Sequence, residues 1–159
     1  MENKVVKKER KKVEFKINDI TLKRFSETDF KNYGLKESDL DNGGCNIGFK
    51  IAVDNNNKMI ALSILAEFFA DVKDNILFSI ETVHEFKIKY FNRLFKKQEG
   101  GLYDIPDAIL MHLLGIAIGG TRGMIVASVQ IPQYKKIFLP LITTSQLLDA
   151  YKKEIKTDS

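Results

Sequence analysis

The order of the apolar patterns is the feature that most constrains how this chain can fold. Residues 13–90 alternate apolar and polar side chains in strand-like runs, whereas Asp104 to about Val129 is an apolar stretch of helical length. A sheet that is followed by one long helix must be covered by that helix on one face. We therefore expect a single α+β domain over residues 13–156, after a basic arm at residues 1–12.

Four runs with the period of a strand occupy the first half of the chain. The first begins with Val13, Phe15 and Ile17 on one face, and its phase changes at Asn18-Asp19, which predicts a bulge. The other three runs are about Cys45–Val53, Lys58–Ala70 and Ile76–Tyr90. Turn-forming residues separate these three runs, so we expect them to form an antiparallel meander. A long polar connection, Ser26 to Gly44, joins the first run to the second.

The long helix has capping residues at its start and a regular spacing of glycines within it. Asp104 is a candidate N-cap, and Pro106 stands where a missing N–H costs nothing. Gly115, Gly119 and Gly123 recur every four residues and therefore share one face. Each glycine costs about 0.8–1 kcal/mol against alanine in an exposed helix. Close packing of that face against the sheet or against a second subunit would offset this cost.

Two segments follow the long helix. Ile137 to Ile142 is a short strand-like run, and Ser145 to about Lys156 has the apolar stripe of an amphipathic helix. We expect a four-stranded antiparallel sheet with the long helix and this C-terminal helix packed on one face.

The charge and the cysteine content of the chain indicate its cellular compartment and its possible binding partners. The net charge is +4, and much of the excess lies within residues 1–12, which is typical of a solvated, disordered arm. A basic nucleic-acid-binding module is the alternative interpretation of that arm. The single cysteine, Cys45, excludes an internal disulfide, and the first residues contain no apolar signal segment, so we expect a cytoplasmic protein. Ala108 to Val129 is long enough to span a bilayer, but Arg122 within it would cost roughly 2.5–3.5 kcal/mol, so we interpret it as buried in a soluble assembly.

No pattern in the chain indicates an enzyme. The two histidines, His84 and His112, stand alone, His84 among polar neighbours in the fourth run and His112 in the apolar helix. A single histidine of this kind is usually a structural residue. Residues 119–123 are rich in glycine but lack the Lys-Ser/Thr ending of a phosphate-binding loop. We expect no catalytic residue, no metal ligand and no cofactor.

Three segments resemble the SecB family of protein-export chaperones, in its divergent SecB-like branch. They are Phe15 to Ile20 (FKINDI) in the first run, Thr121-Arg122-Gly123 in the long helix, and Phe138 to Ile142 (FLPLI) before the last helix. The resemblance extends over about Val13 to Lys153 and depends on the order and spacing of the elements.

This resemblance implies an ATP-independent holdase, a dimer or homotetramer that binds unfolded polypeptides in apolar grooves for protein export. The groove residues that it implies are Phe25, Phe30, Tyr33, Leu35, Phe138, Leu141 and Leu148. The helix face with Gly115, Gly119 and Gly123 would lie at the subunit interface. The acidic positions with which such chaperones bind the export motor ATPase fall at Arg24 and Ser79, so binding to that motor is in doubt. A dedicated chaperone of a toxin–antitoxin pair is the alternative within the family.

Overall fold

A computed structural model of the 159-residue chain describes residues 13–71, 75–140 and 143–157. The predicted basic arm at residues 1–12 and the groove candidate Leu141 lie outside the described residues. The main elements are β1 (Phe15–Glu27), β2 (Gly44–Asp54), β3 (Met59–Phe69), β4 (Ile76–Ile88), α2 (Asp107–Ser128) and α3 (Thr144–Thr157). The shorter ones are η1 (Phe30–Tyr33), η2 (Glu37–Asn42), α1 (Phe91–Leu94), β5 (Lys96–Lys97), η3 (Glu99–Gly101), β6 (Tyr103–Asp104) and η4 (Pro132–Lys136).

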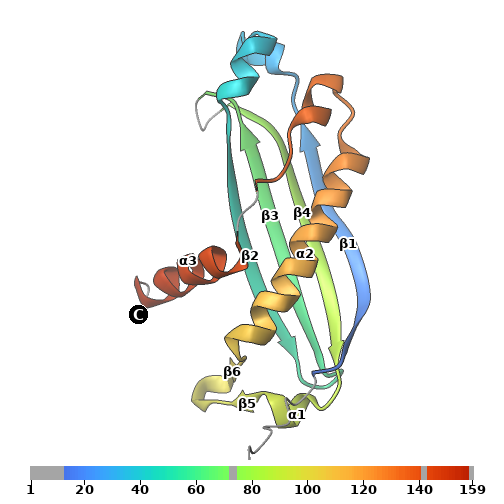
Figure 1. The fold of residues 1–159 in the computed structure, drawn as a ribbon, viewed down its shortest axis with the longest axis vertical. Coiled ribbons are helices and arrows are strands. Elements are labelled where there is room, and N and C mark those ends of the chain that lie inside the picture. The colour runs from blue at the N-terminus through green and yellow to red at the C-terminus, as the bar shows by residue number, and fades with distance from the viewer. Residues whose placement is uncertain (1–12, 72–74, 141–142, 158–159) are drawn as a thin grey trace, which may run out of the picture.

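The four long strands form one antiparallel sheet in the order β1-β4-β3-β2 (Figure 1). This confirms the predicted α+β fold and the meander of the last three strands. β1 pairs with β4, so the connection that carries η1 and η2 crosses from one edge of the sheet to the other. The predicted bulge is present, because the β1 register shifts between Ile17 and Asp19. A second shift, between Leu22 and Arg24, was not predicted.

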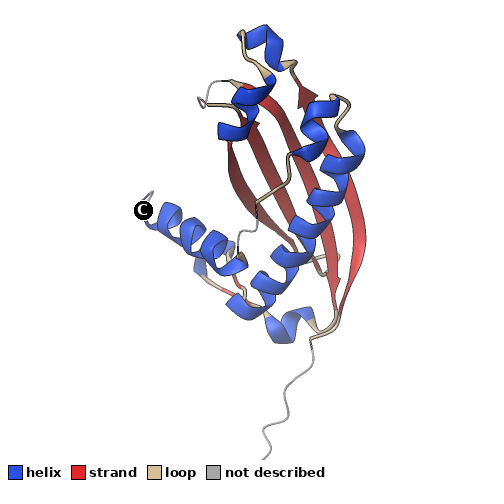
Figure 2. Cartoon of the chain, turned by 45° about the horizontal axis from the view of Figure 1, so that its top comes forward, coloured by secondary structure: helices blue, strands red, loops and turns tan. Residues whose placement is uncertain are grey.

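The core lies between one face of the sheet and α2, and α3 contacts α2 and extends away beyond the β2 edge (Figure 1 and Figure 2). Ile60, Leu62 and Ile64 of β3 are completely buried, and the residues between them lie on the other face. Leu113 and Leu114 of α2 are also completely buried. α2 is long and apolar enough to cross a membrane by length and composition alone, but this face of it packs on the sheet.

Two boundaries differ from the predictions. α2 begins at Asp107 with Pro106 at the N-cap position, so the prediction that Asp104 caps the helix is wrong. Asp104 instead belongs to β6 and pairs with Lys96 of β5. Ile137 to Pro140 form no strand, because η4 turns the chain just before them. Leu139 is buried, and the Pro140 carbonyl accepts a hydrogen bond from Nη2 of Arg122 at 2.9 Å, which holds the segment against α2.

His84 of β4 lies beneath α2 and is completely buried, with Thr82 and Thr121 as its polar neighbours. Its Nε2 is 3.0 Å from Oγ1 of Thr82, which is 2.8 Å from Oγ1 of Thr121 on α2. A Cβ atom on Gly120 would be 2.6 Å from Cε1 of His84. A glycine at position 120 is therefore what allows the helix to lie over the imidazole.

Substitution of Gly120 tests this close approach. We expect Gly120→Ala to lower the free energy of unfolding by roughly 1–3 kcal/mol, because the added methyl group overpacks the His84 ring. Gly119→Ala is the matched control, since a Cβ atom there meets nothing within 4 Å, and alanine favours the helix by up to about 1 kcal/mol. Urea unfolding of both variants measures the contrast. Equal effects of the two substitutions would contradict the assigned role of Gly120.

Candidate functional site

The described residues contain no arrangement typical of a catalytic centre. Within them, no group of three or more His, Cys, Asp or Glu side chains lies close enough to hold a metal ion. Burial, with the nearby charge of Glu67, raises the pKa of the Cys45 thiol to about 12, so the reactive thiolate is disfavoured at neutral pH. His112 is exposed on α2 and contacts the ring of Phe15 edge to face.

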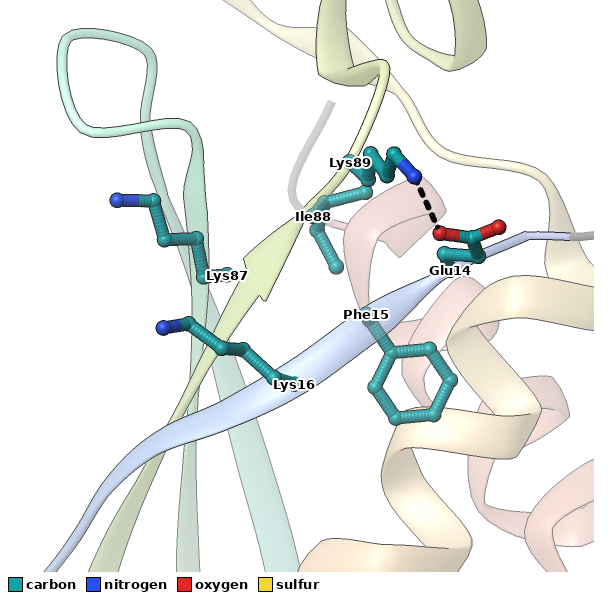
Figure 3. Close-up of a pocket in the computed structure, with 6 residues that line it drawn as sticks. All are labelled: Glu14, Phe15, Lys16, Lys87, Ile88 and Lys89. Atoms are coloured by element: carbon teal, nitrogen blue, oxygen red, sulfur yellow. Dashed lines mark hydrogen bonds and ion pairs between the residues drawn. The ribbon is translucent and has the colours of Figure 1, made fainter.

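A hollow of about 350 Å³ lies where β1 begins and β4 ends, and it is lined by charged and apolar side chains (Figure 3). Phe15 points toward the helices, whereas Lys16 and Lys87 point side by side to the opposite side. Lys89 forms an ion pair with Glu14 at 2.7 Å, and both side chains are about half exposed. Exposed ion pairs of this kind contribute little free energy, so the hollow is a solvated end of the sheet.

An apolar hollow lies at the beginning of β2. We call it the Phe138 hollow; its volume is about 140 Å³, and its lining includes Leu40, Cys45, Phe69, Ile137 and Phe138. Phe138 is 68% exposed, an unusual state for a phenylalanine. A polar hollow of about 480 Å³ between η2 and η4 shares Leu40 and Ile137 with it. The Phe138 hollow therefore continues into the polar hollow through these two shared residues.

Three long-range contacts hold the segment that carries Phe138. The carboxylate of Glu27, at the end of β1, accepts hydrogen bonds from the backbone N–H of Gln130 at 3.2 Å and of Ile131 at 3.1 Å. The hydroxyl of Tyr134, a completely buried residue, donates to the carbonyl of Thr28 at 2.6 Å. The end of β1 thus positions one wall of the Phe138 hollow.

A second hollow, of about 420 Å³, lies at the other end of β2, and we call it the Leu102 hollow. Its apolar side chains include Ile51, Val53, Leu102, Tyr103, Leu148 and Tyr151, and its polar side chains are Gln98, Asp104, Asp107 and Lys152. Leu102 is 69% exposed, whereas Leu148 is buried in the floor. α3 is held here by the Tyr151 ring, 4.6 Å from that of Phe49, and by an ion pair between Lys152 and Asp107.

Both hollows use the face of β2 that points toward the helices. Cys45 lines the first, and Ile51 and Val53 line the second. Cys45 and Val53 are separated by about 26 Å at the usual rise of a strand. β2 is an edge strand that pairs only with β3 within the described sheet. An edge strand with apolar hollows at both ends offers side-chain pockets beside backbone groups.

The groove candidates from the sequence lie in different environments. Phe138 and Leu148 line the two hollows, whereas Phe30 is buried with its ring 6.4 Å from that of Tyr134. Phe25 packs near Phe78, Leu35 packs on the core, and the Tyr33 hydroxyl donates to the carbonyl of Ile76. Sequence reasoning did not include the following lining residues: Leu40, Cys45, Ile51, Val53, Phe69, Leu102, Ile137 and Tyr151. The alternation of β2 was the available signal for Ile51 and Val53.

A second exposed apolar surface lies on β1. We call Ile17, Ile20 and Leu22 the β1 stripe; they lie on the sheet face that α2 covers, yet Ile17 is 47% and Leu22 is 42% exposed. In the sheet register Ile20 is opposite His84 and Leu22 is opposite Thr82, so the stripe lies beside the position of α2. On α2, Gly119 and Gly123 face away from the sheet, where a Cβ atom would meet nothing within 4 Å.

No family model and no curated protein matches this chain. Among solved structures, the chain is similar to a SecB-like chaperone of Mycobacterium tuberculosis in complex with a ChAD peptide from the antitoxin HigA1. The two share 13% identity with a TM-score of 0.46, over 71% of this chain and 76% of the other. A protein of unknown function from Streptococcus agalactiae is similar at 14% identity and a TM-score of 0.29, over 74% of this chain and 91% of that one. Neither TM-score reaches 0.5, so neither likeness establishes a family for this chain.

Proposed function

We propose that this protein is an ATP-independent holdase of the cytoplasm that binds unfolded polypeptide segments along β2. The observation that carries the proposal is the pair of apolar hollows at the two ends of this edge strand, with Phe138 and Leu102 largely exposed at their rims. Exposed apolar surface of this kind, bordered by polar groups, is typical of sites that bind other proteins. The resemblance of the sequence to the SecB family agrees with this function.

The geometry of β2 suits an extended client. A segment that reaches both hollows has to span about 26 Å, which takes roughly eight residues in extended conformation. Alternate side chains of such a segment point the same way, so they can enter the hollows while its backbone lies beside the edge strand. Apolar contacts without fixed polar partners accept many sequences, which is what a holdase requires.

We also propose that client binding here does not depend on the export motor ATPase. At the positions where docking carboxylates are expected, Arg24 forms an ion pair with Glu81 at 3.3 Å, and Ser79 is hydrogen-bonded to Ser26 at 2.7 Å. Both pairs join β1 to β4. One carboxylate that is already paired with an arginine offers little attraction to a basic peptide.

We further propose that the protein assembles as a dimer or tetramer through the β1 stripe and the glycine face of α2. The stripe exposes three branched aliphatic side chains on one face of an edge strand, and Val126 of α2 is also exposed. No described residue of the same protomer lies within 4 Å of a Cβ atom built on Gly119 or Gly123, so packing within the described chain does not explain these glycines. A second copy that approaches closely along this face would bury both surfaces.

The holdase function predicts that the hollows determine client affinity. We expect the double variant Phe138→Ser and Leu102→Ser to bind a chemically unfolded client about tenfold more weakly. This corresponds to a combined loss of about 1.4 kcal/mol of binding free energy for the two residues. Leu65→Thr is the control, because Leu65 is 36% exposed on the opposite face of the sheet. Light scattering follows the aggregation of several unrelated clients without ATP.

Two outcomes bear on this prediction. Equal protection by the wild type and the double variant would exclude the hollows as the binding site. Failure of the wild type to delay aggregation of any client in the panel would count against a general holdase.

The assembly prediction compares two exposed leucines on opposite faces of the sheet. Leu22→Lys, on the β1 stripe, should reduce the mass in solution because it places a charge in the apolar contact, whereas Leu65→Lys should leave the mass unchanged. Gly119→Leu should also reduce the mass, because the larger side chain prevents close approach. Light scattering coupled to size-exclusion chromatography measures the mass. A wild-type monomer, or an assembly unaffected by Leu22→Lys and Gly119→Leu, would refute the interface.

A further inference from the structure

The contact between α2 and the sheet contains a buried polar cluster that the proposed function does not use. We call His84, Thr82 and Thr121 the His84 relay; all three side chains are completely buried. Thr82 and His84 come from β4, and Thr121 comes from α2, so the relay joins the helix to the sheet. Buried polar groups have strict hydrogen-bonding requirements, because water cannot replace a missing partner.

The direction of every hydrogen bond in the relay follows from the number of protons. Thr121 Oγ1 donates its one proton to the carbonyl of Ala117 at 2.9 Å. The 2.8 Å contact between the two threonine hydroxyls therefore needs the proton of Thr82. Thr82 then has no proton left for the 3.0 Å contact with His84, so Nε2 of the imidazole must be the donor. The relay thus requires the neutral tautomer with its proton on Nε2.

The other ring nitrogen of His84 has no partner. Nδ1 is buried and accepts no hydrogen bond among the described residues. Protonation of His84 would place a proton on this atom and a positive charge between the helix and the sheet. A buried donor without an acceptor is costly, and a buried charge without a counterion is more so.

Among the described residues, no counterion faces His84. The neighbouring positions are Ile20 of β1 and Leu62 of β3 in the sheet register, with Gly120 and Thr121 from α2. The carboxylates of β4, Glu81 and Glu85, lie on the other face of the sheet, where Glu81 pairs with Arg24 and Glu85 accepts a hydrogen bond from Asn18. On α2, Arg122 donates to the Pro140 carbonyl, and the second imidazole, His112, contacts Phe15 about two turns away. Burial accordingly lowers the pKa of His84.

We infer that the His84 relay is an acid-released clamp, in which protonation of Nδ1 breaks the attachment of α2 to the sheet. The released state exposes the covered face of β3 and β4 near Gly120, where the helix now lies directly on the imidazole. This inference concerns the fold and does not depend on the proposed client binding.

The sign of the pH dependence follows from the lowered pKa in the folded state. A solvated histidine has a pKa of about 6.5, and release of α2 exposes His84 on β4 to water, so the released state binds the proton first as the pH falls. The free energy that neutral His84 contributes to holding α2 on the sheet is complete above about pH 6.5. It is lost as the pH falls from there toward the lower pKa of His84 in the folded protein. One extra proton in the released state raises the opening equilibrium constant about tenfold per pH unit.

Native-state hydrogen exchange of the full-length protein measures this opening. The measurement runs from about pH 7.5 to about pH 5 and uses protection factors, which correct for intrinsic exchange. We expect the protection factors of α2 amides to fall about tenfold per pH unit below about pH 6.5. Amides in the central strand β3 should keep their protection. Unchanged protection of α2, or an equal loss in α2 and β3, would overturn the inference.

Two histidine variants identify the group responsible. His84→Gln can still donate to Thr82 but does not titrate, so the pH dependence of α2 protection should disappear. His112→Gln, on the exposed side of the same helix, should retain it. Retention of the dependence in His84→Gln would overturn the inference.

Nitrogen-15 NMR of the wild-type imidazole gives a test that does not require a variant to fold. At neutral pH we expect the proton of His84 on Nε2, as the relay demands. A proton on Nδ1, or titration at the ordinary histidine pKa without loss of α2 protection, would contradict the clamp.

Discussion

The contact between α2 and one face of the sheet determines which apolar surfaces of the described structure are covered and which stay exposed. β3 and β4 contribute completely buried side chains from every second residue, including Ile60, Leu62 and Phe86, and α2 supplies the opposing Leu113 and Leu114. One helix is too narrow to cover four strands, so the two edge strands remain partly uncovered on that face. The hollows beside β2 and the stripe on β1 are both consequences of this geometry.

Local patterns predicted the elements that local forces determine. Alternation located the strands, and Asp54 does accept hydrogen bonds from the N–H groups of Asn56 and Asn57 in the first turn of the meander. The residue with left-handed backbone in this turn is Lys58, with φ of 58°. The N-cap prediction failed because Asp104 pairs within a small second sheet, a tertiary contact that no spacing in the sequence reveals.

The candidate site was less accessible to sequence reasoning than the fold. Exposure of an apolar residue depends on which distant element covers it, so a phenylalanine pattern cannot separate Phe30, which is buried, from Phe138, which is not. Leu102 follows two glycines in an irregular segment with no periodicity to mark it. His84 stood out only as a lone histidine, because its partner Thr121 is 37 residues away and meets it only when α2 is in place.

The pairing of β1 with β4 also determines the order in which the chain can fold. β1 leads the described chain, yet Phe15 pairs with Ile88, and Glu27 receives its N–H donors from Gln130 and Ile131. During synthesis the meander of β2, β3 and β4 can form before Gln130 and Ile131, whose N–H groups hold the end of β1, have been made. Such distant pairings slow folding, and an unpaired strand is prone to association with other chains. β1, the first of the four strands in chain order, is therefore the last of them to be secured, and a nascent chain of this protein is itself a candidate for protection by a chaperone.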